Sequence, residues 1–133
     1  MDIFFADPEA VPLPPDEVRI LDLEVVPYPD GRRLRVLIEL TPFQKYPSGE
    51  VNITDSLGNP VASTSFIEAI TPKLEMTLHL RNIDPKGEYH LAMILFYPQE
   101  IEDEQPGEQT LMRSEKKVVD EKTLYFTVGV NEV

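Results

Sequence analysis

The stretch that most constrains the fold runs from Leu80 to Tyr97, where one strand ends, a turn follows and a long strand begins. Before the turn, residues 73–81 alternate apolar and polar side chains, as in a strand with one face on a core and one face in water. After the turn, residues 89–97 also alternate between two faces, but the side chains of both faces are largely apolar. This pattern indicates either a central strand that is covered on both sides or one with an exposed apolar outer face, and it predicts antiparallel β-structure.

The turn itself has the residues of a tight corner. Pro85 fixes its own φ angle, and Gly87 is free to adopt a positive one. The spacing Leu80-x-x-Ile83-x-Pro85-x-Gly87-x-Tyr89-x-Leu91 resembles the corner between two strands of fibronectin type III domains and their immunoglobulin-like relatives. The resemblance implies a tyrosine corner, in which the Tyr89 hydroxyl bonds back to the loop containing Ile83 and Asp84. Pro85, Gly87 and Tyr89 would then be structural residues.

The rest of the chain repeats short alternating segments between turns rich in proline and glycine. We expect strands at residues 18–26, 33–41, 50–54, 61–66, 73–81, 89–97 and 124–128. Prolines bracket these strands and none falls inside one, and no segment has the periodicity of an amphipathic helix. The pattern predicts an all-β fold, a seven-stranded antiparallel immunoglobulin-like (fibronectin type III-like) β-sandwich.

We expect one domain, because 133 residues suffice for a single core. Residues 1–16 form a proline-rich N-terminal arm, and residues 17–133 form the β-sandwich domain with an acidic insertion near 98–122. The apolar residues of the arm have three possible fates: packing on the domain's own sheet, docking on a neighbour, or disorder.

The formal net charge of −12 makes nucleic acid an unsuitable partner, because an acidic surface repels phosphate groups. The chain has no cysteine, which excludes disulfides and thiol chemistry. Its first residues lack the features of a secretory signal, and no apolar run approaches the length of a membrane span. We therefore expect no membrane association and, by default, a cytoplasmic location.

Catalytic motifs are not evident in the sequence. It contains no G-x-S-x-G elbow and no glycine-rich phosphate loop, and His79 and His90 are expected in different sheets. We expect no enzyme activity, no cofactor and no dedicated metal site. One alternative concerns the acidic insertion, where Glu100, Glu102, Asp103 and Glu104 offer hard oxygen ligands for a cation such as Ca²⁺, against the simpler interpretation of a solvated loop.

The candidate interface consists of Ile94, Phe96 and Tyr125. By the strand pairing that the resemblance implies, these side chains share the face opposite the core. An exposed apolar patch normally marks an interface, unless the N-terminal arm or residues 109–119 fold back over it. The expected function is that of a protein–protein interaction module, with an unknown protein partner or by self-association.

An alternative function is that of a ligand-binding accessory domain for carbohydrate or calcium. Its binding platform would be the acidic insertion together with exposed tyrosines such as Tyr28, Tyr46 or Tyr125.

Overall fold

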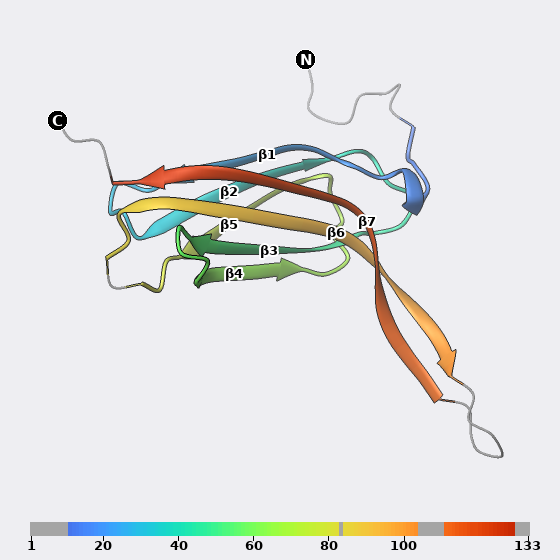
Figure 1. Cartoon of the computed structure of the whole chain (residues 1–133). Coiled ribbons are helices and arrows are strands. Elements are labelled where there is room, and N and C mark those ends of the chain that lie inside the picture. Colours follow the sequence, from blue (N-terminus) through green and yellow to red (C-terminus); the bar gives the residue numbers. More distant parts are fainter. Residues whose placement is uncertain (1–10, 83, 104–110, 130–133) are drawn as a thin grey trace.

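In the residues that the structure describes, the fold is all-β, with seven strands in two antiparallel sheets that pack face to face (Figure 1). The computed structural model describes residues 11–82, 84–103 and 111–129, and at residues 100–103 and 111–114 it describes the backbone alone. Within these ranges the single helical element is a 3₁₀ turn at Pro15–Glu17, and no helix is long and apolar enough to cross a membrane. The expected all-β architecture is confirmed.

Three strands form one sheet and four form the other. The order in the first sheet is β1-β2-β5, with β1 at Ile20–Pro27, β2 at Arg33–Leu40 and β5 at Lys73–His79. The order in the second is β4-β3-β6-β7, with β4 at Pro60–Phe66, β3 at Ser48–Asp55, β6 at Gly87–Asp103 and β7 at Leu111–Val128.

The core lies between the sheets and follows from the alternation along each strand. Inward positions of β2, β3 and β6 are apolar and fully or almost fully buried: Leu34, Val36, Ile38, Leu40, Val51, Ile53, Leu91, Met93 and Leu95. At one end of the core, Gly49 leaves room for the ring of Phe66, because a Cβ atom at Gly49 would lie 2.4 Å from Phe66 Cζ. Interdigitation of the two inner faces is what holds a β-sandwich together.

The described part of the N-terminal arm packs on its own domain. Leu13 forms an isolated parallel bridge with Phe43, its N–H donates to the Pro42 carbonyl at 3.2 Å, and its carbonyl accepts from the Gln44 N–H at 2.9 Å. Leu13 also packs against the core cluster. Of the three fates expected for the arm, self-packing therefore holds for this segment, while residues 1–10 lie outside the described residues.

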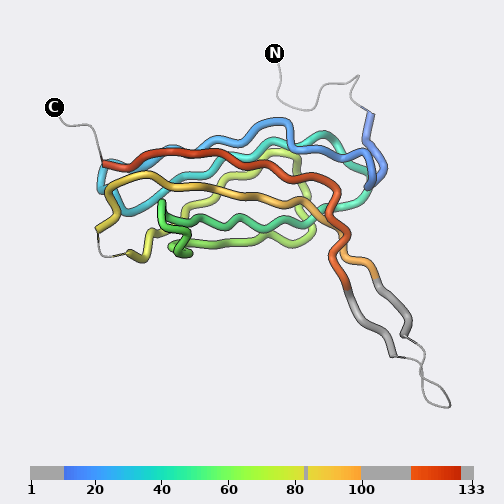
Figure 2. Tube along the Cα trace, in the orientation of Figure 1, coloured from blue at the N-terminus to red at the C-terminus, as the bar shows by residue number. Residues whose placement is uncertain are grey.

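Strands β6 and β7 are longer than the sequence indicated. β3 pairs with β6 only as far as Phe96, but β6 and β7 pair with each other to Asp103 and Leu111 (Figures 1 and 2). The expected acidic insertion is thus largely a two-stranded continuation of the sheet. Pro98 lies inside β6, contrary to the expectation that no proline falls inside a strand. It is tolerated because both strands of such a ribbon have a free edge, where a missing N–H costs no ladder bond.

A β-bulge marks the point where this ribbon leaves the body. The register shifts between Leu95, which pairs with Asp120, and Phe96, which pairs with Val118, so Val119 is the additional residue. A bulge bends and twists its strand. The neighbouring Asp120 carboxylate accepts a hydrogen bond from the Ile20 N–H at 2.9 Å, and this contact fixes the start of β1 against β7.

The turn between β1 and β2 is closed by Asp30. Its carboxylate accepts hydrogen bonds from the backbone N–H groups of Arg32 (2.9 Å) and Arg33 (3.1 Å) and from Arg33 Nε (2.7 Å). These bonds, chiefly that from the Arg32 backbone N–H and next that from the Arg33 side chain, lower the pKa of Asp30 from 3.8 to about 2. Donors that favour the charged form of a carboxyl group always act in this direction.

This pKa has a measurable consequence. Because the pKa is lower in the folded chain than in the unfolded one, Asp30 stabilises the fold above pH 3.8 and loses this contribution as the pH falls toward 2. A carboxyl NMR titration should show a midpoint near 2 for Asp30. In Arg33→Ala the midpoint should rise only part of the way, since the Arg32 N–H remains. A midpoint at the ordinary value in the unchanged chain would contradict the turn geometry.

Candidate interaction surface

The outer face of the four-stranded sheet brings together the three residues of the candidate interface. His90, Ala92, Ile94 and Phe96 alternate with the buried side chains of β6, and the register places Tyr125 of β7 beside His90. The prediction that Ile94, Phe96 and Tyr125 share the face opposite the core agrees with this register. Their exposure differs, however, and this divides the surface into two parts.

Tyr125 dominates one part. Its side chain is 81% exposed. The ring lies 4.8 Å from the ring of His90, centroid to centroid, with 36° between the planes. The register continues from His90 to Thr54 of β3, so Tyr125 belongs to a row that crosses three strands. The Tyr125 ring therefore contacts His90 on the neighbouring strand and is otherwise largely open to solvent.

Ile94 and Phe96 form the other part and are half-buried. Lys116 lies over Phe96, with Nζ 5.3 Å from the ring centroid, and it also forms an ion pair with Glu50. The direct cross-strand neighbours of Ile94 are Glu50 and Glu121. Charged side chains therefore already cover Phe96 and flank Ile94, as cation–π and snorkelling lysines commonly do.

The two segments expected to cover this surface, the N-terminal arm and residues 109–119, lie in different places. The N-terminal segment from Val11 to Leu13 runs beside Phe43 and Gln44 instead. Within the segment 109–119, Lys116 covers Phe96, so the expected cover is present for this part of the segment. Residues 109 and 110 lie outside the described residues. Tyr125 is reached by neither of these described segments, so it is the open part of the surface.

The corner residues take the structural positions that the resemblance implied. Gly87 has a φ of 130°, a value that favours glycine. The Tyr89 hydroxyl donates to the Pro85 carbonyl and accepts from Asn82 Nδ2 at 2.8 Å, and the ring stacks on Phe126 at 5.4 Å. Pro85 directly follows Asp84, so the hydroxyl bonds to the loop that contains Ile83 and Asp84, although Ile83 itself lies outside the described residues.

The candidate cation site stays a prediction. Glu100, Glu102 and Asp103 belong to β6 rather than to a loop, but their side chains, and all of Glu104, lie outside the described residues. In the part of the chain that the structure describes, no group of three or more histidine, aspartate or glutamate side chains is close enough to hold a metal ion. His79 and His90 belong to different sheets, as expected.

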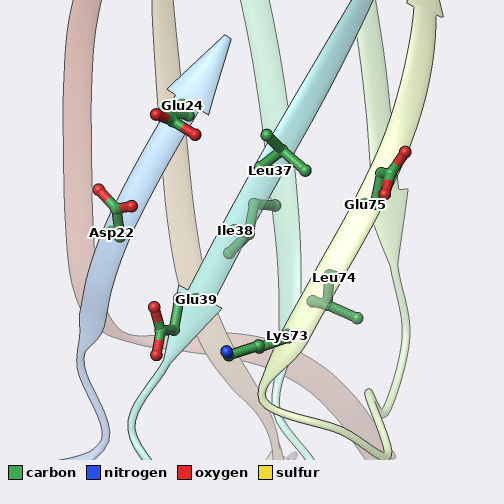
Figure 3. A pocket seen from close by; sticks show the side chains of 8 residues that line it. All are labelled: Asp22, Glu24, Leu37, Ile38, Glu39, Lys73, Leu74 and Glu75. Carbon is green, nitrogen blue, oxygen red and sulfur yellow. The ribbon is translucent and has the colours of Figure 1, made fainter. Parts of the chain in front are cut away.

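A hollow of about 380 Å³ lies on the outer face of the three-stranded sheet (Figure 3). Two cross-strand rows form it: Asp22, Glu39 and Lys73, and Glu24, Leu37 and Glu75. Sequence reasoning did not single out these residues, because the pairing that assembles the rows is not visible in any one segment. Glu75 is already bound to Arg35 Nε at 2.6 Å, and the residues that line the hollow include no serine, threonine, cysteine or histidine. It has the features of a solvated sheet face.

Comparison with known proteins adds little to this description. No model of a protein family matches the chain, and no curated protein matches its sequence. Among solved structures, it is similar to β-glucuronidase from Ruminococcus gnavus in complex with C6-substituted uronic isofagomine, at 19% identity and a TM-score of 0.44. The apo structure of that enzyme gives 17% and 0.43. Each match covers 86% of this chain but 16% of the glucuronidase chain.

Proposed function

We propose that this chain is a non-enzymatic interaction module that holds a protein partner against the outer face of the four-stranded sheet, with Tyr125 as its anchor. The observation that supports this proposal is the 81% exposure of Tyr125, whose hydroxyl makes no hydrogen bond within the described residues. A tyrosine supplies a large contact area for the loss of only two side-chain torsions. For this reason tyrosine is enriched among residues that dominate binding energy.

The surroundings of Tyr125 favour a protein interface. Glu88, which pairs with Thr127, borders Tyr125 on one side, and the other neighbouring positions are neutral and small or polar: Asn52, Thr54, Ala92 and Thr123. Covering these four positions requires no burial of an unpaired charge, which is the costly step in forming an interface. The charged residues Glu50, Glu121 and Lys116 lie toward the other end of the face, where they would form a polar rim. On a chain with a net charge of −12, such a neutral area is a favourable contact region.

We also propose that the sandwich is of the fibronectin type III kind within the immunoglobulin-like group. The strand orders β1-β2-β5 and β4-β3-β6-β7 are in keeping with it, and so is the Tyr89 hydroxyl that donates to the Pro85 carbonyl at the start of β6. Domains of this architecture serve many unrelated functions, so the proposed interaction rests on Tyr125 and not on the fold.

Tyr125→Ala tests the proposed function. Used as bait in a lysate of the native host, the unchanged chain should retain a partner that Tyr125→Ala loses by at least about tenfold, because an interface hot spot costs upwards of 1.4 kcal/mol. Tyr46→Ala is the matched control, because Tyr46 is also exposed but lies at the opposite end of β3. Tyr46 comes just before the start of β3, and the row that contains Tyr125 crosses β3 near its end, at Thr54. Far-ultraviolet circular dichroism should be the same for all three proteins.

The opposite result is equally informative. If Tyr125→Ala and the unchanged chain retain the same proteins in equal amounts, this face is not the interface. The alternative of a carbohydrate- or calcium-binding accessory domain is tested with the same proteins, by a glycan array and by melting with and without Ca²⁺. A glycan signal that depends on Tyr125, or a calcium-dependent rise of several degrees in the melting midpoint, would replace the proposed function.

A further inference from the structure

Strand β4 is the outermost strand of the four-stranded sheet and pairs with β3 alone (Figure 1). A bulge at its start leaves Val61 unpaired, after which Ala62 to Phe66 pair regularly with Gly49 to Ile53. In the described part of the chain, the one backbone bond between this strand and the segment after β5 is donated by the Arg81 N–H to the Val61 carbonyl, at 3.0 Å. The regular half of β4 therefore presents a free backbone edge.

This edge lacks the usual protection against pairing with another chain. Proteins protect edge strands with charged side chains, prolines or bulges. From Asn59 to Ile67 there is no charged residue, and the proline and the bulge are confined to the first two positions of the strand. The other edge strands carry charges, among them Asp22 on β1, Glu75 on β5 and Lys122 on β7. β4 is the neutral edge of a strongly acidic molecule.

Large apolar side chains are exposed at both ends of β4. Leu57, in the turn before the strand, is 84% exposed, and Ile67 and Ile70, just after it, are 77% and 74% exposed. The loop that presents the two isoleucines is held in place: the Glu68 N–H donates to Ser48 Oγ at 3.1 Å, and the Ala69 N–H donates to the Pro47 carbonyl at 2.8 Å. Exposed apolar groups on an ordered loop are typical of interaction sites.

We infer that β4 pairs antiparallel with β4 of a second copy of this chain, across a two-fold axis, to join two four-stranded sheets into one of eight strands. Antiparallel pairing places the end of one β4 beside the start of the other. Ile67 and Ile70 of each copy then approach Leu57 of its partner, so the exposed apolar groups at the two ends are complementary. The same patch on both copies is what a two-fold interface requires.

The self-complementary placement of Leu57 at one end of β4 and of Ile67 and Ile70 at the other selects a second copy as the occupant. Two molecules of net charge −12 repel each other overall, so a neutral strand is a favourable place for them to meet. β4 meets this condition from Asn59 to Ile67, and the nearest charges are Asp55 before this run and Glu68 directly after it. A two-fold axis perpendicular to the sheet also leaves both Tyr125 residues on the same side of the dimer. The pairing itself does not depend on Tyr125 or on its proposed partner.

Opposite charges on β4 test the pairing. Ser63 and Ser65 are exposed on the outer face. When the two-fold axis lies near the middle of β4, the serines of one copy lie opposite the serines of the other. In sedimentation equilibrium the unchanged chain should dimerise, and Ser63→Lys/Ser65→Lys and Ser63→Glu/Ser65→Glu should each dimerise at least about tenfold more weakly, because like charges directly opposite destabilise strand pairs. An equimolar mixture of the two variants should recover the dimer.

Two controls make the result specific. Thr123→Lys/Thr127→Lys adds the same charges to exposed positions of β7 on the same face and should leave the dimer unchanged. Ile67→Ser/Ile70→Ser should weaken dimerisation without adding charge. The inference is overturned if the unchanged chain is monomeric up to its highest soluble concentration, or if the mixture of lysine and glutamate variants stays monomeric. Tyr125→Ala should still dimerise, so this experiment and the partner experiment fail independently.

Discussion

Replacing Leu91 with alanine should lower the free energy of unfolding by about 2–5 kcal/mol. Leu91 is fully buried in the part of β6 that crosses the core, and it pairs with Ile53 on one side and Leu124 on the other. Truncation removes apolar contacts with both neighbours and leaves a cavity that the flanking strands, fixed by their ladders, can close only in part. A loss of this size is a large fraction of the stability of a domain with a single core.

Urea unfolding followed by circular dichroism measures this loss. The midpoint should fall while the slope with denaturant stays the same, which indicates that stability and not the extent of unfolding has changed. Leu21→Ala is the matched control, because Leu21 is 55% exposed and lies on β1, away from β4, and its truncation should change stability by less than about 0.5 kcal/mol. Equal effects of the two substitutions would contradict the position of the core.

Tyr89→Phe should lower the free energy of unfolding by about 1–3 kcal/mol, although it removes a single oxygen atom. The hydroxyl donates to the Pro85 carbonyl and accepts from Asn82 Nδ2, so its loss leaves a carbonyl and an amide with one partner fewer at a corner that is nearly closed to water. The ring keeps its stacking on Phe126, at 5.4 Å, in the phenylalanine variant. The cost therefore reports the hydrogen bonds alone.

The same urea measurement applies, with Tyr125→Phe as control. The Tyr125 hydroxyl has no partner among the described residues, so its removal should leave the unfolding midpoint unchanged within error. Tyr97→Phe should give an intermediate loss, because the buried Tyr97 hydroxyl donates one hydrogen bond, to the Lys45 carbonyl at 2.9 Å. If Tyr89→Phe has no larger effect than Tyr125→Phe, the corner is not a source of stability.

Much of the fold was predictable because its signals are local. Strict alternation in β2 and β5 follows from the two-residue period of a strand, and the Pro85–Gly87 turn follows from two residues with special φ preferences. The extent of β6 and β7 was not predictable in this way. Pro98 and the acidic residues after it are typical of a loop, but they pair with residues of β7 from 111 to 116, and such pairing is non-local.

The candidate surface shows the same division. Ile94, Phe96 and Tyr125 were placed on one face because alternate residues of neighbouring strands point the same way. Their unequal exposure was not predictable. Phe96 lies under Lys116, and the two residues come together only because β6 and β7 pair in one particular register, shifted by the bulge at Val119.

What the sequence alone determined is therefore the kind of structure: strands, their inward faces, the corner at Tyr89 and the neutral character of β4. These depend on residue type and on a period of two, which any single segment displays. Only the tertiary structure decided that Tyr125 is open while Phe96 is covered, that Leu57 and Ile67 stand at opposite ends of a free edge, and that β6 and β7 continue as a ribbon. Each of these depends on the strand with which a segment pairs elsewhere in the chain, and the exposure of a side chain is defined only once that pairing has formed.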